Sequence, residues 1–397
     1  MTRTLTAIAI AAAAGTAFAQ ETFVVPDDFP TLQQVLDPNV SGIDPGDIVV
    51  LRDSVSYVGT FDVLVAALTI RAAEGDTPVL DANGAGTVIT VNIANSNLTL
   101  EGLTIEDGGR VGNNDRGTGI DIANAGTVTI RDCVIRNNAS KNGGGLFARN
   151  TDVVVEDSIF QNNSAPNGGG MFVDGASDVT IRNTTFLGNA ATSGIGGGIE
   201  IQVTTANAIT IEGSTFTGNS CTAHGGAADL QDAGFVTITD TVFTGNTATQ
   251  SADDDGGALF IDRIEHLTSI RGCIFDSNLA NGNGAAVNSV LGNGRRCEYV
   301  DTRFIGNEAS GSAIAAAGGT IDFFNCEFIA NTSLRAGNEN GDGGAIRFVR
   351  FDDRTRAFGR VFNTIFDGNI GNLGGAVVIG RGSTVDILNS TFVNNEA

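Results

Sequence analysis

The strongest constraint on the fold of this chain is a short element, Phe-x-x-Asn, that returns nine times. It starts at Phe160, Phe186, Phe216, Phe243, Phe275, Phe304, Phe328, Phe366 and Phe392, and a variant with isoleucine runs from Ile135 to Asn138. The asparagines that end successive elements lie 24 to 38 residues apart. A repeat of this length is typical of a solenoid, in which one repeat is one coil and no separate domain cores form.

Three further features keep a fixed place around each element. An alternating apolar and polar segment precedes it, as in Val128 and Ile130, which predicts a strand with one buried face. A turn-forming residue follows the strand, at Asp132, Asp157, Asn183, Gly213, Asp240, Gly272, Asp301, Asn325, Asn363 and Asn389. A glycine pair and a short strand come next, beginning at Gly143, Gly168, Gly196, Gly256, Gly343 and Gly374, with looser versions at Gly225, Gly284 and Gly311.

These features together predict an all-β fold, a right-handed parallel β-helix of about ten coils, since parallel crossovers are right-handed by default. Each strand then pairs with its copy one coil away, so phenylalanine stacks on phenylalanine and the asparagines form a hydrogen-bonded ladder. A leucine-rich or helical solenoid is excluded because no segment after the N-terminus keeps a 3.6-residue apolar period.

Both ends of the chain differ from the repeats. Residues 1–19 have the features of a secretory signal peptide: Arg3, a short apolar stretch, and Ala17-Phe18-Ala19 as a cleavage site. Residues 20–60 are expected to form an N-terminal cap with a short helix at 31–36 and the first strands, and residues 61–397 the coils. The chain stops inside a repeat, so no C-terminal cap is expected, and either a further segment or another molecule would cover the last coil.

The five cysteines do not suggest a disulfide framework. Cys133, Cys273 and Cys326 occupy a repeat position where other coils have serine or threonine, which predicts small buried residues in one column. Cys221 and Cys297 fall elsewhere, and an odd total leaves at least one thiol outside any pair within the chain.

Charge and hydropathy exclude several partners. The chain carries 45 acidic against 22 basic residues, a net charge of -23, which repels nucleic acids and anionic membrane surfaces. No later apolar run is long enough for a transmembrane helix, so the chain as given should contain no membrane anchor.

The Gly-Gly-Ala-aliphatic and Phe-x-x-Asn tetrapeptides resemble the repeats of the chlamydial polymorphic outer-membrane proteins over about residues 130–397. The segments VPDDFPTLQQVLD and GDIVVLRDSVSY resemble the start of bacterial secreted pectin-lyase-like β-helix proteins. The first resemblance implies surface display and adhesion, together with a C-terminal autotransporter barrel that we do not expect in the chain as given. The second implies a fold shared by polysaccharide lyases, polygalacturonases and proteins without catalytic activity.

Few residues stand out as a site. Asp253, Asp254 and Asp255 are candidate Ca²⁺ ligands, although a solvated acidic loop is the alternative. The insertion at 349–360 contains Asp352 and Asp353 among arginines, which favours exposed ion pairs over a catalytic base.

No catalytic residue is assigned from the sequence. Cys221 and His224 have a metal-like spacing, but no second pair exists to complete a zinc site. The favoured hypothesis is therefore an exported surface or secreted protein with a non-enzymatic adhesive or structural role and no obligatory cofactor, whose partners include cell-surface, matrix or glycan ligands. The alternative is a polysaccharide lyase or glycoside hydrolase, motivated by the resemblance and the acidic loops.

Overall fold

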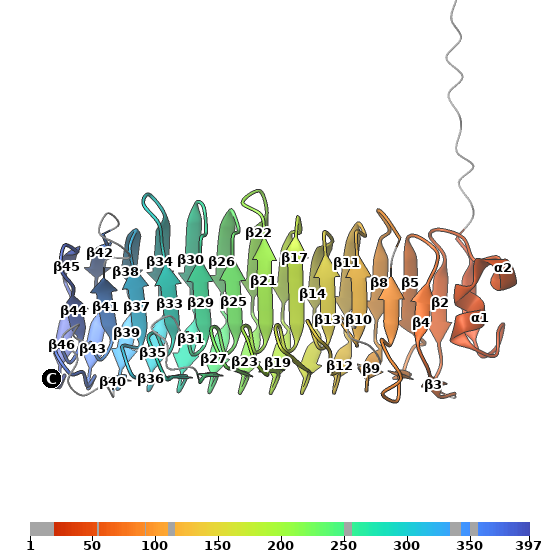
Figure 1. The fold of residues 1–397 in the computed structure, drawn as a ribbon, viewed down its shortest axis with the longest axis horizontal. Helices are drawn as coiled ribbons and strands as arrows, with labels where there is room; N and C mark the ends of the chain where they lie inside the picture. The colour runs from red at the N-terminus through yellow and green to blue at the C-terminus, as the bar shows by residue number, and fades with distance from the viewer. Residues whose placement is uncertain are drawn as a thin grey trace, which may run out of the picture.

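A computed structural model of the chain describes residues 20–53, 55–91, 93–109, 116–249, 256–333, 343–349 and 356–397. These residues form one elongated parallel β-solenoid, in which the coils follow one another from the N-terminal to the C-terminal end (Figure 1). The predicted signal peptide, Asp253–Asp255 and the aspartates of the 349–360 insertion lie outside the described residues.

Each coil contributes one strand to each of three long sheets, and a fourth, shorter sheet appears in the middle coils. Sheet A contains β1 (Thr22–Val25), β2 (Ile48–Leu51), β5 (Leu68–Ala72), β8 (Leu98–Glu101), β11 (Thr127–Arg131), β14 (Asp152–Glu156), β18 (Val179–Arg182), β22 (Ala208–Glu212), β26 (Phe235–Thr239), β30 (Leu267–Arg271), β34 (Arg296–Val300), β38 (Thr320–Phe324), β42 (Phe358–Phe362) and β45 (Thr384–Leu388). Sheet B contains β3 (Tyr57–Val58), β6 (Val79–Asp81), β9 (Thr104–Glu106), β12 (Val134–Arg136), β15 (Ile159–Gln161), β19 (Thr185–Leu187), β23 (Thr215–Thr217), β27 (Val242–Thr244), β31 (Ile274–Asp276), β35 (Arg303–Ile305), β39 (Glu327–Ile329), β43 (Ile365–Asp367) and β46 (Thr391–Val393).

Sheet C contains β4 (Phe61–Val63), β7 (Ile89–Val91), β10 (Ile120–Ala123), β13 (Leu146–Arg149), β17 (Met171–Gly175), β21 (Ile199–Val203), β25 (Ala228–Gln231), β29 (Leu259–Asp262), β33 (Val287–Val290), β37 (Ile314–Ala317), β41 (Ile346–Val349) and β44 (Val377–Ile379). Sheet D contains the two-residue strands β16 (Ser164–Ala165), β20 (Ala190–Ala191), β24 (Ser220–Cys221), β28 (Thr247–Ala248), β32 (Leu279–Ala280), β36 (Glu308–Ala309) and β40 (Thr332–Ser333). Sheet C has 12 strands, so the solenoid has about 12 coils rather than the ten expected. The additional coils precede residue 127, where the chain has no Phe-x-x-Asn element to count.

The repeated phenylalanines form the predicted stack inside the solenoid. From Phe160 to Phe392, neighbouring rings lie 4.6 to 5.1 Å apart between centroids and within 15° of parallel. Offset stacked rings attract one another beyond the effect of burial alone. Because one phenylalanine sits in the same place on each coil, the stack also fixes the register between coils.

The repeat asparagines form the predicted ladder beside that stack. The Nδ2 and backbone N–H of Asn219 both donate to Oδ1 of Asn246, each at 3.0 Å, and Asn246 repeats both bonds to Asn278. From Asn189 onward, each Nδ2 also donates to the carbonyl of a phenylalanine one coil back, as from Asn246 to Phe216 at 2.9 Å. The ladder therefore provides hydrogen-bond partners for buried backbone and side-chain amide groups at the turn that follows each sheet B strand.

The turn residues and cysteines also lie where the sequence predicts. The ten turn formers all have positive φ, from 47° at Asn183 to 62° at Gly272, a left-handed conformation that Asn, Asp and Gly tolerate. All five cysteines are described, and all are buried thiols rather than disulfides. Ser158 Oγ accepts from the backbone N–H of Cys133 at 3.1 Å, which shows that cysteine and serine share one column.

Two short helices lie at the N-terminal end of the solenoid (Figure 1). α1 (Leu32–Leu36) is capped by Thr31, whose side chain accepts from the backbone N–H of Gln34, and α2 (Pro38–Ser41) follows directly. Leu32, Val35 and Leu36 are buried in the same core as the first strands. The helix expected at 31–36 therefore covers the first coil.

Candidate functional site

The second residue of each strand in sheet C forms a column on the outer side of the solenoid. Met171 and Val173 of β17 lie in the central core, whereas Phe172 between them does not. The column runs in register through Phe147, Phe172, Glu200, Asp229, Phe260 and Asn288. All six are nevertheless buried, at 7% exposure or less. In these six strands, the outer face of sheet C is therefore covered at this position.

The glycine turn before each strand provides that cover. Gly196 has φ of +65°, and a Cβ placed on it would lie 2.8 Å from the Cβ of Glu200. A Cβ on Gly225 would likewise lie 2.8 Å from the backbone nitrogen of Asp229. Only glycine allows the chain to approach the strand this closely with positive φ. The glycine pairs of the repeat thus bury side chains that strand alternation alone would leave exposed.

Two acids occupy adjacent places in this otherwise aromatic stretch. Glu200 on β21 and Asp229 on β25 are in-register partners, so their backbones lie about 4.8 Å apart. Asp229 Oδ1 accepts from Nε2 of Gln231 at 2.7 Å. Glu200 Oε2 and Asp229 Oδ2 are buried and have no hydrogen-bond partner among the described residues. Buried polar atoms are normally paired, so these two oxygens need an explanation.

The surroundings favour the neutral form of both acids. Burial raises the pKa of Asp229 from 3.8 to about 8, against the opposing hydrogen bond from Gln231. Burial also raises the pKa of Glu200 from 4.5 to about 9, with a further contribution from the neighbouring negative charges of Asp229 and Asp174. The pair therefore retains protons near neutral pH, where ordinary carboxyl groups have lost theirs.

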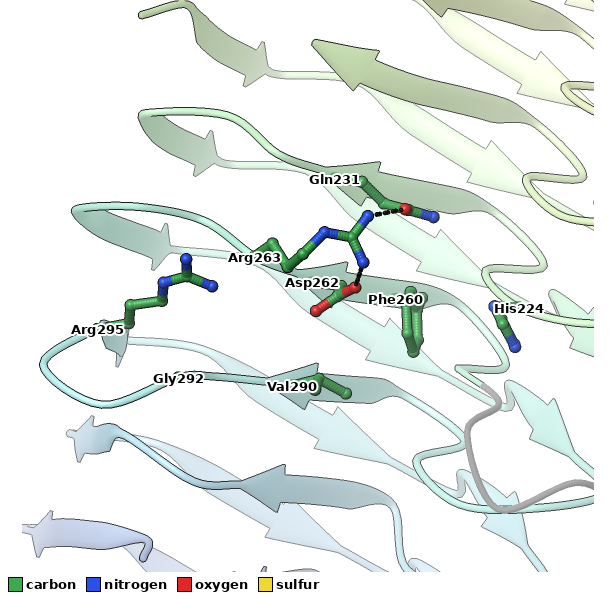
Figure 2. Close-up of a pocket in the computed structure, with 8 residues that line it drawn as sticks. All are labelled: His224, Gln231, Phe260, Asp262, Arg263, Val290, Gly292 and Arg295. Carbon is green, nitrogen blue, oxygen red and sulfur yellow. Dashed lines mark hydrogen bonds and ion pairs between the residues drawn. The ribbon is translucent and has the colours of Figure 1, made fainter. Parts of the chain in front are cut away.

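His224 links this buried pair to the surface. It follows β24 and places Nδ1 3.8 Å from Oδ2 of Asp229, with its side chain 31% exposed. Its ring stacks on Phe260 with centroids 4.6 Å apart, which fixes its orientation (Figure 2). One edge of the imidazole thus lies beside a buried acid, while the residue as a whole lines an open cleft.

That cleft crosses β25, β29 and β33 and encloses roughly 430 Å³. It is lined by His224, Gln231, Phe260, Asp262, Arg263, Val290, Gly292 and Arg295 (Figure 2). Phe260 and Val290 give it an apolar patch. The remaining side chains offer amide, carboxylate, guanidinium and imidazole groups, so the cleft combines an apolar wall with several planar polar groups.

Arg263 is held rigidly within the cleft. It binds both carboxylate oxygens of Asp232, at 2.6 Å from Nε and 2.9 Å from Nη2, and Nη2 also donates to Gln231 at 2.8 Å. A further ion pair joins it to Asp262 (Figure 2). The hydrogen bonds from Arg263 lower the pKa of Asp232, whereas burial raises that of Asp262.

Arg295, which also lines the cleft, forms an ion pair with Glu265, with 3.1 Å between Nη2 and Oε2. Both arginines that line the cleft are thus matched by aspartate or glutamate. The cleft has no net positive charge to attract an anionic ligand.

In the part of the chain that the structure describes, the acids and the histidine at this cleft do not form a group close enough to share one metal ion. Among the described residues, one group of three acidic or histidine side chains is close enough to share an ion, namely Asp81, Glu106 and Asp107 on sheet B and the turn after it. Glu106 is already paired with Arg136, and no other feature there indicates a ligand. The Asp253–Asp255 candidates lie outside the described residues and remain a prediction.

Glu200 and Asp229 were not predicted as site residues from the sequence, and His224 was given no chemical role. Strand alternation placed the two acids on a solvent-facing side, where charged residues need no explanation. Aligning the residue after each Gly-Gly-x-aliphatic element would have shown two adjacent acids between Phe172 and Phe260. This alignment was the feature of the sequence from which the two acids could have been recognised as unusual.

The fold and its repeats define the class of protein. Residues 79–233 match the right-handed beta helix region, and residues 240–262 match the Chlamydia polymorphic membrane protein repeat. The chain is therefore a right-handed parallel β-helix that contains a repeat of the polymorphic membrane protein type. The predicted right-handed β-helix is confirmed, and the resemblance to the chlamydial repeats is confirmed over residues 240–262.

Two solved structures align with this chain over most of their length. One is PfbA, a surface adhesin of Streptococcus pneumoniae, with 13% identity and a TM-score of 0.38, covering 80% of this chain and 89% of that one. The other is a mannuronic acid specific polysaccharide family 6 lyase from human gut microbiota, with 12% identity and a TM-score of 0.34, covering 93% of this chain and 82% of that one. At these scores neither protein's role is transferred to this chain.

No curated protein matches the sequence. Among the described residues, no helix has the length and apolar character needed to cross a membrane.

Proposed function

We propose that the protein is an exported β-helix that binds neutral polysaccharide chains in the cleft on sheet C. The observation that carries this proposal is the rigid arrangement of Gln231, Asp262 and Arg263 beside the apolar surface of Phe260 and Val290. Sugars present hydroxyl pairs that donate and accept hydrogen bonds, together with apolar C–H faces. Planar side chains held in place by their own partners bind such groups at a low entropic cost.

The charge balance favours a neutral over an acidic glycan. Asp232 and Asp262 neutralise Arg263, and Glu265 neutralises Arg295. The net charge of -23 also repels polyanions at long range. A uronic-acid polymer would have to displace existing ion pairs, whereas a neutral chain leaves them intact.

Export and a surface or secreted location are part of the same proposal. The signal-peptide features of residues 1–19 and the polymorphic membrane protein repeat at 240–262 support them. A glycan-binding solenoid in that location would serve adhesion or attachment to an extracellular matrix.

The test is affinity electrophoresis of the purified protein in gels containing glucans, xylan, mannan or galactan, with alginate and polygalacturonate as acidic comparisons. Retardation is expected in at least one neutral gel and in neither acidic gel. Arg263→Leu should abolish it, because Gln231 and Asp262 lose the partner that orients them.

Arg303→Leu is the matched control, because Arg303 is as exposed as Arg263 but pairs with Glu327 on sheet B, away from the cleft. Equal loss in both variants, retention only in the acidic gels, or migration unaffected by any polysaccharide would contradict the proposal.

A further inference from the structure

The two acids of the sheet C column lack a structural purpose among the described residues. Phenylalanine fills the same position on either side of them, at Phe172 and Phe260. A third and fourth aromatic ring would continue the column without leaving a polar atom to satisfy. Glu200 and Asp229 instead bury two oxygens without a hydrogen-bond partner among those residues. Such groups are costly to the fold, and they concentrate at sites where chemistry requires them.

His224 gives this pair a route to the cleft. Its Nδ1 lies 3.8 Å from Asp229 Oδ2, and the residue lines the same cavity as Gln231 and Arg263. Distances between catalytic partners are often long without a ligand and shorten when one binds. The imidazole of His224 therefore lies between the buried carboxyl group of Asp229 and the cleft.

We propose that His224, supported by Asp229 and Glu200, is a general acid–base that hydrolyses a glycosidic bond of the neutral polysaccharide held in the cleft. This inference rests on the proposed binding function and makes the protein a glycoside hydrolase as well as a binder. His224 is the catalytic residue. Asp229 and Glu200 act through it and are positioning residues.

The reaction uses one proton, which returns at the end. Asp229 passes its proton to Nδ1 of His224, and Nε2 gives a proton to the glycosidic oxygen. The bond from that oxygen to the anomeric carbon breaks, and its electron pair goes to the oxygen, leaving an oxocarbenium-like sugar. A water oxygen then bonds to this carbon, and its surplus proton returns through His224 to Asp229. The net change is one water consumed and one glycosidic bond cleaved.

Elimination, the other common route for cleaving polysaccharides, fits this cleft less well. It requires a uronic acid whose carboxylate is neutralised so that the neighbouring C–H becomes acidic. Arg263 and Arg295 would have to supply that positive charge, yet both are already paired. Hydrolysis needs no charge on the substrate and so agrees with the balanced cleft.

Burial sets the response of the pair to pH, and the surrounding charged groups modify it. Asp174 on β17 raises the pKa of Glu200, and Asp262 at the end of β29 and Arg263 directly after it shift the pKa of Asp229 in opposite directions. Burial dominates for both acids, so they retain protons until the pH reaches about 8 for Asp229. Hydrolysis should therefore fall on the alkaline side of that pH as the proton supply is lost.

The test measures new reducing ends released from the neutral polysaccharide that the protein binds, across a range of pH. His224→Gln should lower the rate by roughly 100-fold or more, the usual contribution of a general acid, with binding retained. Asp229→Asn and Glu200→Gln should lower kcat rather than raise KM and should displace the alkaline limb, a change that a purely structural role would not produce. His266→Gln is the control, because this exposed histidine lies against Phe235 on sheet A, with ring centroids 4.8 Å apart, and does not line the cleft.

The outcomes separate the two proposals. No binding to any neutral polysaccharide overturns the proposed function. Binding without release of reducing ends, or release that survives in His224→Gln, overturns the hydrolase inference and leaves the binding function standing. Release of products with the ultraviolet absorbance of an unsaturated sugar would also overturn it, because such products arise by elimination.

Discussion

Replacing Asp229 by asparagine is expected to make the protein more stable at neutral pH. In an unfolded chain this carboxyl group has a pKa near 3.8, whereas burial raises it to about 8 in the folded protein. Well below pH 3.8 the carboxyl group is protonated in both states, so its ionisation makes no contribution to the free energy of unfolding. Above that pH the unfolded state releases a proton that the folded state retains, so stability falls as pH rises and the loss levels off above the folded pKa.

The size of the effect follows from these two values. Each pH unit between them lowers the free energy of unfolding by about 1.4 kcal/mol. At pH 7 the Asp229 carboxyl therefore costs about 4 kcal/mol. The asparagine amide is neutral at every pH, but its buried N–H groups retain a desolvation penalty of about 1–3 kcal/mol. A net gain of about 1–3 kcal/mol is therefore expected at pH 7, and a net loss of up to about 2 kcal/mol at pH 4, where the carboxyl costs little and the amide penalty remains.

The measurement is urea unfolding of the wild type and the variant at several pH values from 4 to 8, followed by circular dichroism. Because coils of a solenoid can unfold separately, hydrogen exchange in β21, β25 and β29 should accompany it. Asp62→Asn is the matched control, since Asp62 occupies the same strand position of sheet C on β4 but is exposed.

Two results would refute the reasoning. The first is a wild-type stability in these strands that does not decline from pH 4 to 8. The second is a loss of stability in Asp229→Asn at pH 7 that exceeds the change in the Asp62→Asn control. Either would mean that the buried acid is ionised and stabilising at neutral pH.

Three further predictions concern the core. Asn246→Ala should destabilise the protein by about 2–5 kcal/mol, measured by urea unfolding, because the Asn219 backbone N–H and the Phe216 carbonyl lose the bonds that Asn246 provides, and Asn219 Nδ2 keeps only its bond to the Phe186 carbonyl. An unchanged midpoint would show that the ladder contributes nothing. Phe243→Ala should cost about 3–5 kcal/mol, since its ring is stacked between Phe216 and Phe275, and hydrogen exchange should increase first in the adjacent coils rather than at the ends. Cys273→Ser should change stability by less than about 1 kcal/mol, because serine fills this column in other coils. In the wild type, burial raises the pKa of the Cys273 thiol to about 12, so a thiol reagent at pH 7 should label it only after unfolding.

The fold could be predicted from the sequence because stacking makes each coil repeat the preceding one. Phe243 and Asn246 lie against copies of themselves, so their positions in the chain also give their neighbours in space. The turn at Asp240 has positive φ, as the residue type indicates. The number of coils was less accessible, since the early coils use aliphatic residues such as Leu80 and Ile105 in place of the phenylalanine.

The site could not be predicted in the same way, because it depends on contacts that the repeat does not specify. Alternation along β21 correctly places Glu200 on the outer face, but its burial results from the turn at Gly196 folding back over it. His224 lies in a loop whose path is not set by any strand. Its contacts with Asp229 and with Phe260 come from two different coils.

A solenoid separates structural from functional residues in an unusual way. Where a column repeats one residue type, its members are explained by stacking, as the asparagines and phenylalanines are. Where a column changes abruptly to residues that lower stability, stacking cannot be the reason for them. The change from Phe172 to Glu200 and Asp229, and back to Phe260, is such a point, and it coincides with His224 and the cleft. If Asp229→Asn increases stability and abolishes hydrolysis together, the same residue will have shown both the cost of the site to the fold and its use.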